Sequence, residues 1–449
     1  MGKLFGTDGI RGIVGDTLDA SLAYRVGQAV VAVLEEKNGH RPLITIGKDT
    51  RISSDMLECA LMAGICSMGG DVMPLGTVPT PAVAYITIKE KADAGIVISA
   101  SHNPFDNNGI KIFNECGYKL PDEVELAVEE KILSGEKMAE KTGDAIGRIL
   151  GGAEKLKAAY VDYVASGVES DLAGLRVAVD CANGASSATA PDLFAKFKLE
   201  ADIIHASPDG ININNGCGST HMDKLREKVL SGGYDLGIAF DGDADRCLFL
   251  DEKGALIDGD QVLAVCATEM KAKGKLNGNT MVATVMSNLG LHEFCRNNGI
   301  DLICTSVGDR NVLEAMLEGG FRIGGEQSGH TIFTEFATTG DGEVNAMQFL
   351  QVLKNSGKKA SELASCCARY PQVLVNVKVS PYNNTKERVM ESAELLAAVK
   401  EEEAKLAGSG RVLVRASGTE ALIRVMVEAK TEETASEVAE RLAELVNNI

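Results

Sequence analysis

The 449-residue sequence contains no tryptophan, and aromatic residues make up only 4% of it. It also lacks a long hydrophobic run: apolar stretches such as 29–34 are interrupted by charge before they could span a bilayer. The N-terminal segment MGKLFGTDGIRG has no apolar core of the kind found in secretory signals. We therefore expect a cytoplasmic protein that does not bind a membrane.

A surplus of basic residues is absent as well. Lys and Arg number 45 against 64 Asp and Glu, which gives a formal net charge of −19. Nucleic acids and anionic membranes both require a dense basic surface, so neither is expected as a partner. If the substrate is an anion, local Arg, Lys, glycine amides or a metal ion must supply the positive potential.

The eleven cysteines include no CxxC pair and no Cys/His spacing typical of a zinc site. Reduced and mostly buried thiols are the expected state. Hydrophobic residues make up 45% of the chain and glycines number 48, which is typical of a globular protein with many tight turns.

A pattern of strands and loops occurs three times, which predicts repeated βαβ units with mainly parallel sheets. Each copy begins with an apolar strand, passes a helix and a second strand, and ends with a third strand that runs into a polar loop. The opening strands are 43–47, 175–180 and 281–286, the middle strands are near 71–76, 201–206 and 301–306, and the closing strands are 94–99, 236–240 and 321–324.

After residue 366 the pattern changes to strands at 373–380, 411–417 and 422–429 with helices at 385–406 and 431–445, which predicts a smaller α+β domain. We expect four domains, at 1–155, 156–253, 254–366 and 367–449. Because binding loops gather at the carboxyl ends of parallel strands, the three closing loops could face one cleft.

DGDADR (241–246), the aspartate loop, follows the second closing strand and indicates a metal site. Asp241, Asp243 and Asp245 alternate, so three carboxylates can converge on one hard cation. A calcium EF-hand loop would place its last ligand at Glu252, but Arg246 occupies the sixth position, where that loop needs glycine. An acidic surface turn is the remaining alternative.

SASHNP (99–104), the serine loop, presents Ser99 and Ser101 beside His102, with Lys111 ahead on the next strand. A loop serine is most often a turn former, and as a nucleophile it would need a base, a cation or a metal for activation. No GxSxG or GxxxxGK[ST] motif is present, so a serine hydrolase or an NTP-driven kinase has no support.

Two further loops are polar. GEQSGH (325–330), the glutamate loop, offers Glu326, Ser328 and His330 for sugar hydroxyls and proton transfer, although an ordinary loop has the same composition. RASGTE (415–420), the arginine loop, is either a hairpin turn or a phosphate site, and its candidate ligands are Arg415, Ser417, Gly418, Thr419 and, on the next strand, Arg424.

Basic residues also occur in two N-terminal loops. Arg11 lies between glycines in the opening segment, and Lys48 and Arg51 follow the first strand of the first copy. Each could be a solvated turn, or could contribute to an anion site in this acidic protein.

Taken in order along the chain, the serine, aspartate, glutamate and arginine loops closely resemble those of the α-D-phosphohexomutase superfamily. The resemblance covers essentially the whole sequence. FGTDGIRG, NINNGCGSTH, MSNLGL and the Gln of GEQSGH are similar to the branch that acts on amino sugars, so the resemblance implies interconversion of glucosamine 6-phosphate and glucosamine 1-phosphate. A mutase for mannose or glucose phosphates, a non-catalytic sugar-phosphate-binding protein and a phosphatase are the alternatives.

The resemblance implies a heart-shaped protein of four domains, the first three mixed α/β and the last a mobile α+β lid. By motif position it implies that Ser101 is a phosphoserine and joins Asp241, Asp243 and Asp245 in holding Mg²⁺. Sugar and phosphate contacts would come from the glutamate and arginine loops, including Glu326, Ser328, Arg415, Ser417, Gly418, Thr419 and Arg424. The reaction centre would include Arg11, His102, Lys111, Arg246 and His330, with the proton-transfer residue left open.

The same resemblance implies a glucosamine 1,6-bisphosphate intermediate, with it or another hexose 1,6-bisphosphate as activator. The product would lead toward UDP-N-acetylglucosamine biosynthesis in amino sugar metabolism. The oligomeric state stays open, with a homodimer as one alternative.

Overall fold

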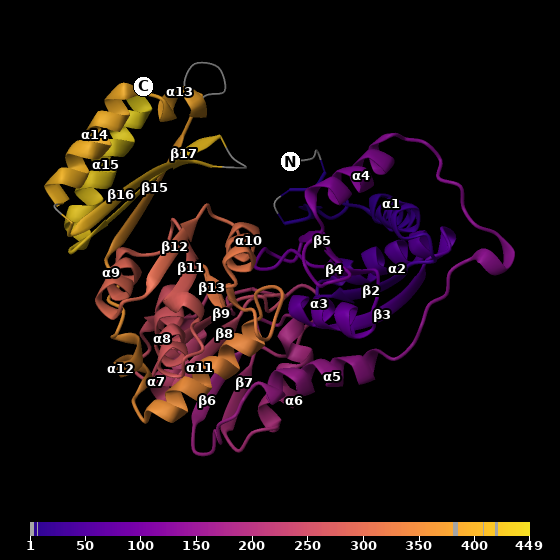
Figure 1. Ribbon diagram of the computed structural model, residues 1–449, viewed down its shortest axis with the longest axis horizontal. Helices are drawn as coiled ribbons and strands as arrows, with labels where there is room; N and C mark the ends of the chain where they lie inside the picture. The colour runs from indigo at the N-terminus through magenta and orange to yellow at the C-terminus, as the bar shows by residue number, and fades with distance from the viewer. Residues whose placement is uncertain (1–3, 7, 380–384, 407, 418–420) are drawn as a thin grey trace. The chain divides into compact units, whose positions relative to one another are not determined.

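The computed structural model describes residues 4–6, 8–379, 385–406, 408–417 and 421–449, and has a mixed α/β fold (Figure 1). The chain divides into two compact units. The first unit holds residues 1–286 and 300–366, and the second holds 287–299 and 367–449. Among the described residues, no helix combines the length and apolarity required to cross a bilayer.

The first sheet of unit one has the strand order β1-β5-β4-β2-β3. Strands β2, β3 and β4 are parallel, and β5 returns antiparallel beside β4. The strands are β1 (Ile10–Ile13), β2 (Leu43–Lys48), β3 (Asp71–Thr77), β4 (Ala94–Ile98) and β5 (Asn107–Asn114), and the helices are α1 (Ala20–Asn38), α2 (Ile52–Ser67), α3 (Thr80–Lys89) and α4 (Asp122–Leu133).

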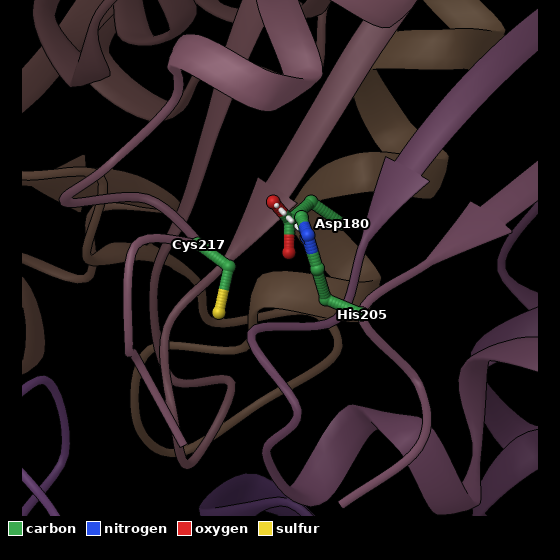
Figure 2. A group of neighbouring side chains, drawn as sticks. All are labelled: Asp180, His205 and Cys217. Carbon is green, nitrogen blue, oxygen red and sulfur yellow. Dashed lines mark hydrogen bonds and ion pairs between the residues drawn. The ribbon is translucent and has the colours of Figure 1, made fainter. Parts of the chain in front are cut away.

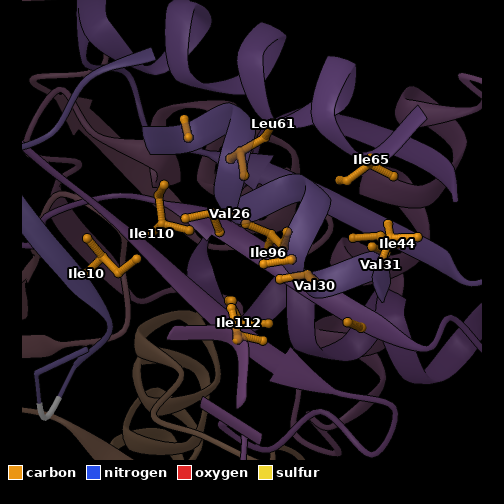
Figure 3. Packing of buried hydrophobic residues seen from close by; sticks show 14 of the residues in the cluster. Ile10, Val26, Val30, Val31, Ile44, Leu61, Ile65, Ile96, Ile110 and Ile112 are labelled. Carbon is orange, nitrogen blue, oxygen red and sulfur yellow. The ribbon is translucent and has the colours of Figure 1, made fainter. Parts of the chain in front are cut away.

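Alternation of side chains along β2 places helices on both faces of this sheet. Ile44 points into the core beneath α1 and α2 (Figure 3), and Ile46, on the same face of β2, belongs to the same buried cluster. Thr45 points the other way, where its Oγ1 lies 2.7 Å from Thr87 Oγ1 of α3. Helices α1 and α2 can approach closely because Gly27 of α1 has no side chain. A Cβ at this position would lie only 2.4 Å from the Leu61 carbonyl oxygen of α2.

The second and third sheets repeat this arrangement. Their orders are β10-β9-β8-β6-β7 and β12-β11-β13-β14, and in each, three parallel strands precede one antiparallel return. The strands are β6 (Arg176–Asp180), β7 (Glu200–Ile204), β8 (Leu236–Phe240), β9 (Cys247–Asp251), β10 (Leu256–Ile257), β11 (Thr280–Thr284), β12 (Asp301–Thr305), β13 (Ile323–Gly325) and β14 (Thr331–Phe333). The threefold repeat is confirmed.

Helices link and cover these two sheets. They are α5 (Ala153–Ser166), α6 (Ala190–Ala195), α7 (Asp223–Gly232), α8 (Gly259–Ala272), α10 (Asp309–Gly319), α11 (Gly342–Ser356) and α12 (Ala360–Ala364). N-terminal capping residues mark where two of these helices begin. Asp258 and Gln261 form a capping box at α8, and the Asp341 carboxylate accepts a hydrogen bond from the Val344 amide at α11.

The repeat places the three closing loops at equivalent positions. The serine loop joins β4 to β5, the aspartate loop joins β8 to β9, and the glutamate loop joins β13 to β14. In each case the chain leaves the carboxyl end of the last parallel strand and turns back antiparallel. This topology explains why polar residues from distant parts of unit one come together.

Unit two contains an antiparallel sheet of order β15-β17-β16. Its elements are β15 (Gln372–Lys378), β16 (Gly410–Ala416), β17 (Leu422–Ala429), α9 (Leu289–Asn298), α13 (Lys386–Met390), α14 (Ala393–Leu406) and α15 (Glu432–Asn448). The α9 amide of Leu289 donates to the Glu428 carboxylate of β17 at 2.8 Å, so this unit includes a segment from the range predicted for the third domain. The exact domain limits stay a prediction.

One predicted helix is interrupted. The single helix expected at 385–406 is two helices, α13 and α14, separated at Glu391 and Ser392. The Ser392 hydroxyl accepts from the Leu395 amide at 3.4 Å, as an N-cap does. A serine in a charged helical pattern therefore begins a new helix here.

Candidate active site

Ser101 lies in the serine loop and is 2% exposed. Its φ of +51° is in the left-handed region, which is uncommon for a residue with a Cβ. The Ser101 amide donates to Ser99 Oγ at 2.9 Å, and its carbonyl accepts from both Arg51 Nη2 and Asn214 Nδ2 at 2.9 Å. The surrounding groups thus hold a strained turn that presents the hydroxyl.

The aspartate loop meets this hydroxyl directly. Ser101 Oγ donates to Asp241 Oδ2 at 2.6 Å across 140 residues of sequence. Asp241, Asp243 and Asp245 are all buried, and a carboxylate oxygen from each lies within 4.8 Å of the others. The predicted convergence of the serine and the three aspartates is present in the structure.

The electrostatics of the three carboxylates fit a divalent cation. Burial and the charges of Asp245 and Asp243 raise the pKa of Asp241 well above its ordinary value. Oδ1 of Asp243 and Oδ1 of Asp245 are buried and have no hydrogen-bond partner among the described residues. Oxygen donors in this number suit Mg²⁺, which would neutralise the repulsion between them.

Lys111, on β5, forms ion pairs with the aspartate loop. Its Nζ lies 2.9 Å from Asp243 Oδ2, 3.5 Å from Asp245 Oδ2 and 3.4 Å from Asp8 Oδ2. Burial opposes its charge, but Asp243 and Asp8 outweigh burial and raise the pKa of Lys111. Lys111 is therefore a fixed positive charge and not a base at neutral pH.

Asp243 has the opposite shift to Asp241. Burial would raise its pKa, but Lys111 and a 2.7 Å hydrogen bond from Thr80 Oγ1 lower the pKa to about 2. One carboxylate of the loop is thus held ionised even without a metal ion. Thr80, at the start of α3, carries no sequence motif that would have identified it.

His102 is held neutral beside Ser101. Burial, and then the charges of Arg246 and Arg11, lower its pKa to about 4. Arg246 Nη1 lies 3.2 Å from His102 Nδ1, and because a guanidinium can only donate, Nδ1 is the acceptor. Ser101 Oγ lies 3.3 Å from the same nitrogen.

A polar cavity of about 280 Å³ opens beside these groups. Six predicted residues line it: Arg11, Ser101, Asp245, Arg246, Glu326 and His330. Its other lining residues are Asp8, Val307, Gly308 and Asp309. The cavity therefore brings the serine, aspartate and glutamate loops to one space within unit one.

The glutamate loop is positioned by its own contacts. Glu326 Oε1 accepts from the Gly308 amide at 3.2 Å, and Glu326 Oε2 accepts from the exposed Ser328 hydroxyl at 3.4 Å. His330 is 3% exposed, and neither ring nitrogen forms a hydrogen bond within the described chain. Its Nε2 lies 3.8 Å from Asp309 Oδ2.

Asp8, Lys119 and Asp309 form a network that sequence reasoning missed. Lys119 Nζ lies 2.7 Å from both Asp8 Oδ1 and Asp309 Oδ2, and Asp8 also pairs with Arg11. Asp8 stands inside the FGTDGIRG segment, which could have indicated it. Lys119 and Asp309 stand alone in sequence, so only the fold identifies them.

Of the two alternatives for Lys48 and Arg51, the contacts of these residues do not support a contribution to an anion site. The Arg51 side chain is fully buried, pairs with Asp49 at 2.8 Å and donates to carbonyls of the serine loop. Lys48 pairs with Asp55 at 2.7 Å and with Glu58. Their positive charges are already compensated by acidic neighbours, so both are structural.

In unit two, Arg415 of β16 and Arg424 of β17 are directly opposite each other in the sheet. Burial, and then the charge of Arg424, lower the pKa of Arg415. Like charges opposite one another destabilise a sheet unless an anion compensates them. Ser417 is 2% exposed, and Gly418 and Thr419 lie outside the described residues.

Four family models match the chain in succession. They describe phosphoglucomutase/phosphomannomutase α/β/α domain I at residues 2–139, domain II at 158–254, domain III at 258–370 and the C-terminal domain at 374–445. Together they cover most of the sequence.

Curated relatives are similar over full length. The phosphoglucosamine mutase of Caldanaerobacter subterraneus subsp. tengcongensis is 51% identical over 448 residues, which is 99% of each chain. That of Acetivibrio thermocellus is 51% identical over 450 residues, covering 100% of this chain and 99% of the relative.

Solved structures share the fold. A phosphoglucomutase/phosphomannomutase family protein from Burkholderia thailandensis has a TM-score of 0.80 at 22% identity, covering 99% of this chain and 97% of that one. Aspergillus fumigatus N-acetylphosphoglucosamine mutase, solved with GlcNAc-6P and magnesium, has a TM-score of 0.71 at 18% identity, covering 99% and 95%.

Proposed function

The chain belongs to the phosphoglucomutase/phosphomannomutase family, and we propose that it is an isomerase that interconverts glucosamine 6-phosphate and glucosamine 1-phosphate. The observation that carries the proposal is the 2.6 Å contact between Ser101 and Asp241, in a chain about half identical to relatives named for this reaction. A hydroxyl beside three buried carboxylates suits a phosphoryl carrier with a divalent cation.

Ser101 is the group that carries the phosphoryl. In the forward direction, the C1 hydroxyl of glucosamine 6-phosphate attacks phosphorus as the bond from phosphorus to Ser101 Oγ breaks, and the electron pair stays on Oγ. The product of this half-reaction is glucosamine 1,6-bisphosphate. After the sugar reorients, Ser101 Oγ attacks the phosphorus at C6 and releases glucosamine 1-phosphate.

Mg²⁺, held by Asp241, Asp243, Asp245 and Ser101, would withdraw charge from the phosphoryl oxygens. Lys111, which lies 2.9 Å from Asp243, and Arg246, which lines the cavity, would add fixed positive charges at the same site. Phosphoryl transfer depends mainly on positioning and charge stabilisation, and such preorganised charges need no rearrangement during reaction.

For the proton of the attacking hydroxyl, we favour His330 as acceptor. It lines the cavity, and both of its ring nitrogens lack hydrogen bonds within the described residues. Lys111 is unsuited because its carboxylate neighbours keep it charged, and His102 Nδ1 already faces the Arg246 guanidinium. Arg11 lines the cavity as a further cation for the phosphate.

Glu326 and Ser328 suit sugar hydroxyls, because a carboxylate accepts from them and a hydroxyl can both donate and accept. Arg415, Ser417, Gly418, Thr419 and Arg424 are proposed to hold the phosphate that is not reacting. The opposed Arg415 and Arg424 support this role, since an anion would relieve their repulsion.

Several finer points belong to the same proposal. A hexose 1,6-bisphosphate would serve as activator by phosphorylating Ser101, and the product would feed UDP-N-acetylglucosamine biosynthesis. The cytoplasmic location and the homodimer stay predictions.

A coupled assay tests the proposal. Purified protein receives Mg²⁺, a trace of glucose 1,6-bisphosphate and, in parallel, glucosamine, mannose or glucose 6-phosphate. We expect glucosamine 6-phosphate to be preferred. Preference for another sugar would change the substrate and keep the mechanism, net release of phosphate would indicate a phosphatase, and binding without turnover would indicate a binding protein.

Ser101→Ala is the matched variant for the mechanism. It removes the phosphoryl carrier while the three aspartates remain, so turnover should vanish and phosphoserine should be missing from the 99–104 peptide by mass spectrometry. A Ser101→Ala protein with full turnover would refute the assignment.

A further inference from the structure

Asp180, His205 and Cys217 form a second cluster of metal-ligating side chains (Figure 2), and none of the three lines the polar cavity. Asp180 ends β6, His205 follows β7, and Cys217 lies in the loop before α7. One ligand atom from each lies within 4.8 Å of the others. The cluster thus occupies the carboxyl edge of the second sheet, where the fold gathers binding groups.

Burial makes this cluster different from an exposed acidic surface. The Asp180 side chain and Cys217 are each 0% exposed, whereas the His205 side chain is 21% exposed. Asp180 Oδ1 accepts from the Ala182 amide at 2.8 Å, and Oδ2 lies 2.9 Å from His205 Nδ1. A fully buried carboxylate needs a compensating cation, and His205 supplies one only when protonated.

The backbone around the cluster is strained. Ala182, Asn183, His205 and Asn214 all have φ between +48° and +58°, and they are half of the eight non-glycine residues with positive φ in the described chain. Such conformations persist where the surroundings fix them, and they concentrate at ligand sites. Ser101 shares this feature at the proposed catalytic centre.

We propose that Asp180, His205 and Cys217 bind a borderline-soft divalent cation of the zinc class, with solvent as fourth ligand on the side where His205 is exposed. On binding, the Cys217 S–H bond releases its proton to solvent and a sulfur–metal bond forms. His205 contributes the lone pair of one ring nitrogen, and Asp180 contributes one carboxylate oxygen.

Ligand chemistry separates this site from the aspartate loop. Thiolate, imidazole and carboxylate together are typical of Zn²⁺, whereas Mg²⁺ prefers oxygen alone. Without a metal ion, burial and Asp180 raise the pKa of Cys217 to about 12, so the thiol is inert. A bound cation favours the thiolate and compensates Asp180 at the same time.

The site would act on the reaction centre through its loops. Asn214, three residues before Cys217, donates its Nδ2 to the Ser101 carbonyl at 2.9 Å, and its own amide donates to the Ala182 carbonyl at 2.9 Å. The Ala185 amide donates to the Gly242 carbonyl of the aspartate loop at 2.8 Å. A metal ion that joins β6, β7 and the Cys217 loop would therefore help to position both catalytic loops.

Cobalt provides a spectroscopic test. Metal-depleted full-length protein is titrated with Co²⁺ in excess Mg²⁺, which fills the all-oxygen aspartate site, and thiolate-to-cobalt charge-transfer absorption is recorded. We expect one equivalent of Co²⁺ to produce the band and Zn²⁺ to abolish it. Cys217→Ala should lose the band, whereas Cys266→Ala, at another buried thiol, should keep it.

His205→Ala is a second variant for the case in which Cys217→Ala does not fold. The His205 side chain is partly exposed, so its removal should disturb the fold less than removal of the buried Cys217 thiol. We expect Zn²⁺ to raise the thermal midpoint of the unmodified protein. His205→Ala should keep its circular dichroism spectrum and lose both the cobalt band and this rise. A cobalt protein with no thiolate band, or with a band that both variants keep, would overturn the proposal.

Discussion

Asn214→Ala isolates the contacts through which loop 212–218 positions Ser101. Asn214 Nδ2 donates to the carbonyls of Ser101 at 2.9 Å and Asn103 at 3.1 Å. Both carbonyls also accept from Arg51 Nη2 at 2.9 Å, so the substitution leaves neither without a donor. Two net hydrogen bonds are lost, at about 0.5 to 1.5 kcal/mol each, which gives roughly 1 to 3 kcal/mol in total.

The backbone adds a separate cost, because Asn214 has a φ of +58° and alanine tolerates this region less well than asparagine. Asn279→Ala is the matched control. Asn279 has a φ of +51° and is exposed, so this change carries a similar backbone cost without touching the serine loop. The difference between the two variants in the free energy of unfolding, measured by urea denaturation, should therefore give the contribution of the two Asn214 hydrogen bonds.

The kinetic effect follows from the same contacts. A loosened serine loop misplaces Ser101 Oγ, and a displacement near 1 Å can lower a rate by about 100-fold. We expect Asn214→Ala to reduce kcat by about 10- to 100-fold with a smaller change in KM, and Asn279→Ala to leave both unchanged. Equal stability loss in the two variants, together with an unchanged kcat for Asn214→Ala, would refute the positioning argument.

Three further predictions concern titration and charge. Burial raises the pKa of Glu343 to about 8, so the stability that protonated Glu343 contributes is present below pH 4.5 and is lost as the pH rises through 8. Glu343→Gln should therefore raise the thermal midpoint much more at pH 8 than at pH 4. An equal change at both pH values would contradict this reasoning. The pKa of His102 is lowered to about 4, so the stability that neutral His102 contributes is present above pH 6.5 and is lost as the pH falls toward 4. His102→Asn should weaken the decrease of the thermal midpoint between pH 6.5 and pH 4. An unaltered decrease would count against the lowered pKa of His102. Arg415→Gln removes a charged phosphate donor worth about 1.5 to 3 kcal/mol, so KM for the sugar phosphate should rise about 10- to 100-fold, while an unchanged KM would remove Arg415 from the phosphate site.

The motifs were readable from sequence because each is contiguous. Asp241, Asp243 and Asp245 stand within five residues after a buried strand, so their convergence needs only one tight turn. The strand at 422–429 was also placed correctly as β17, since alternating apolar residues fix both its position and its faces. Short-range patterns of this kind do not depend on how the chain packs elsewhere.

Cationic loop residues were harder to interpret. Lys48 and Arg51 have the composition of an anion site, but the fold supplies Asp49, Asp55 and Glu58 as their partners. Six of the eleven cysteines are buried: Cys181, Cys217, Cys247, Cys266, Cys295 and Cys367. No spacing rule indicated that one of them lies beside a histidine and an aspartate.

The sequence by itself determined the repeat, the four polar loops and the chemistry that each can support, because these depend on local periodicity and on residue type. Tertiary structure decided which groups meet. Ser101 and Asp241 are 140 residues apart, Ser101 and Asn214 are 113 apart, and Asp180 and His205 are 25 apart, so their contacts exist only once the sheets form and pack. The pKa shifts of Lys111 and His102 likewise arise from burial and distant charges, which no local pattern encodes.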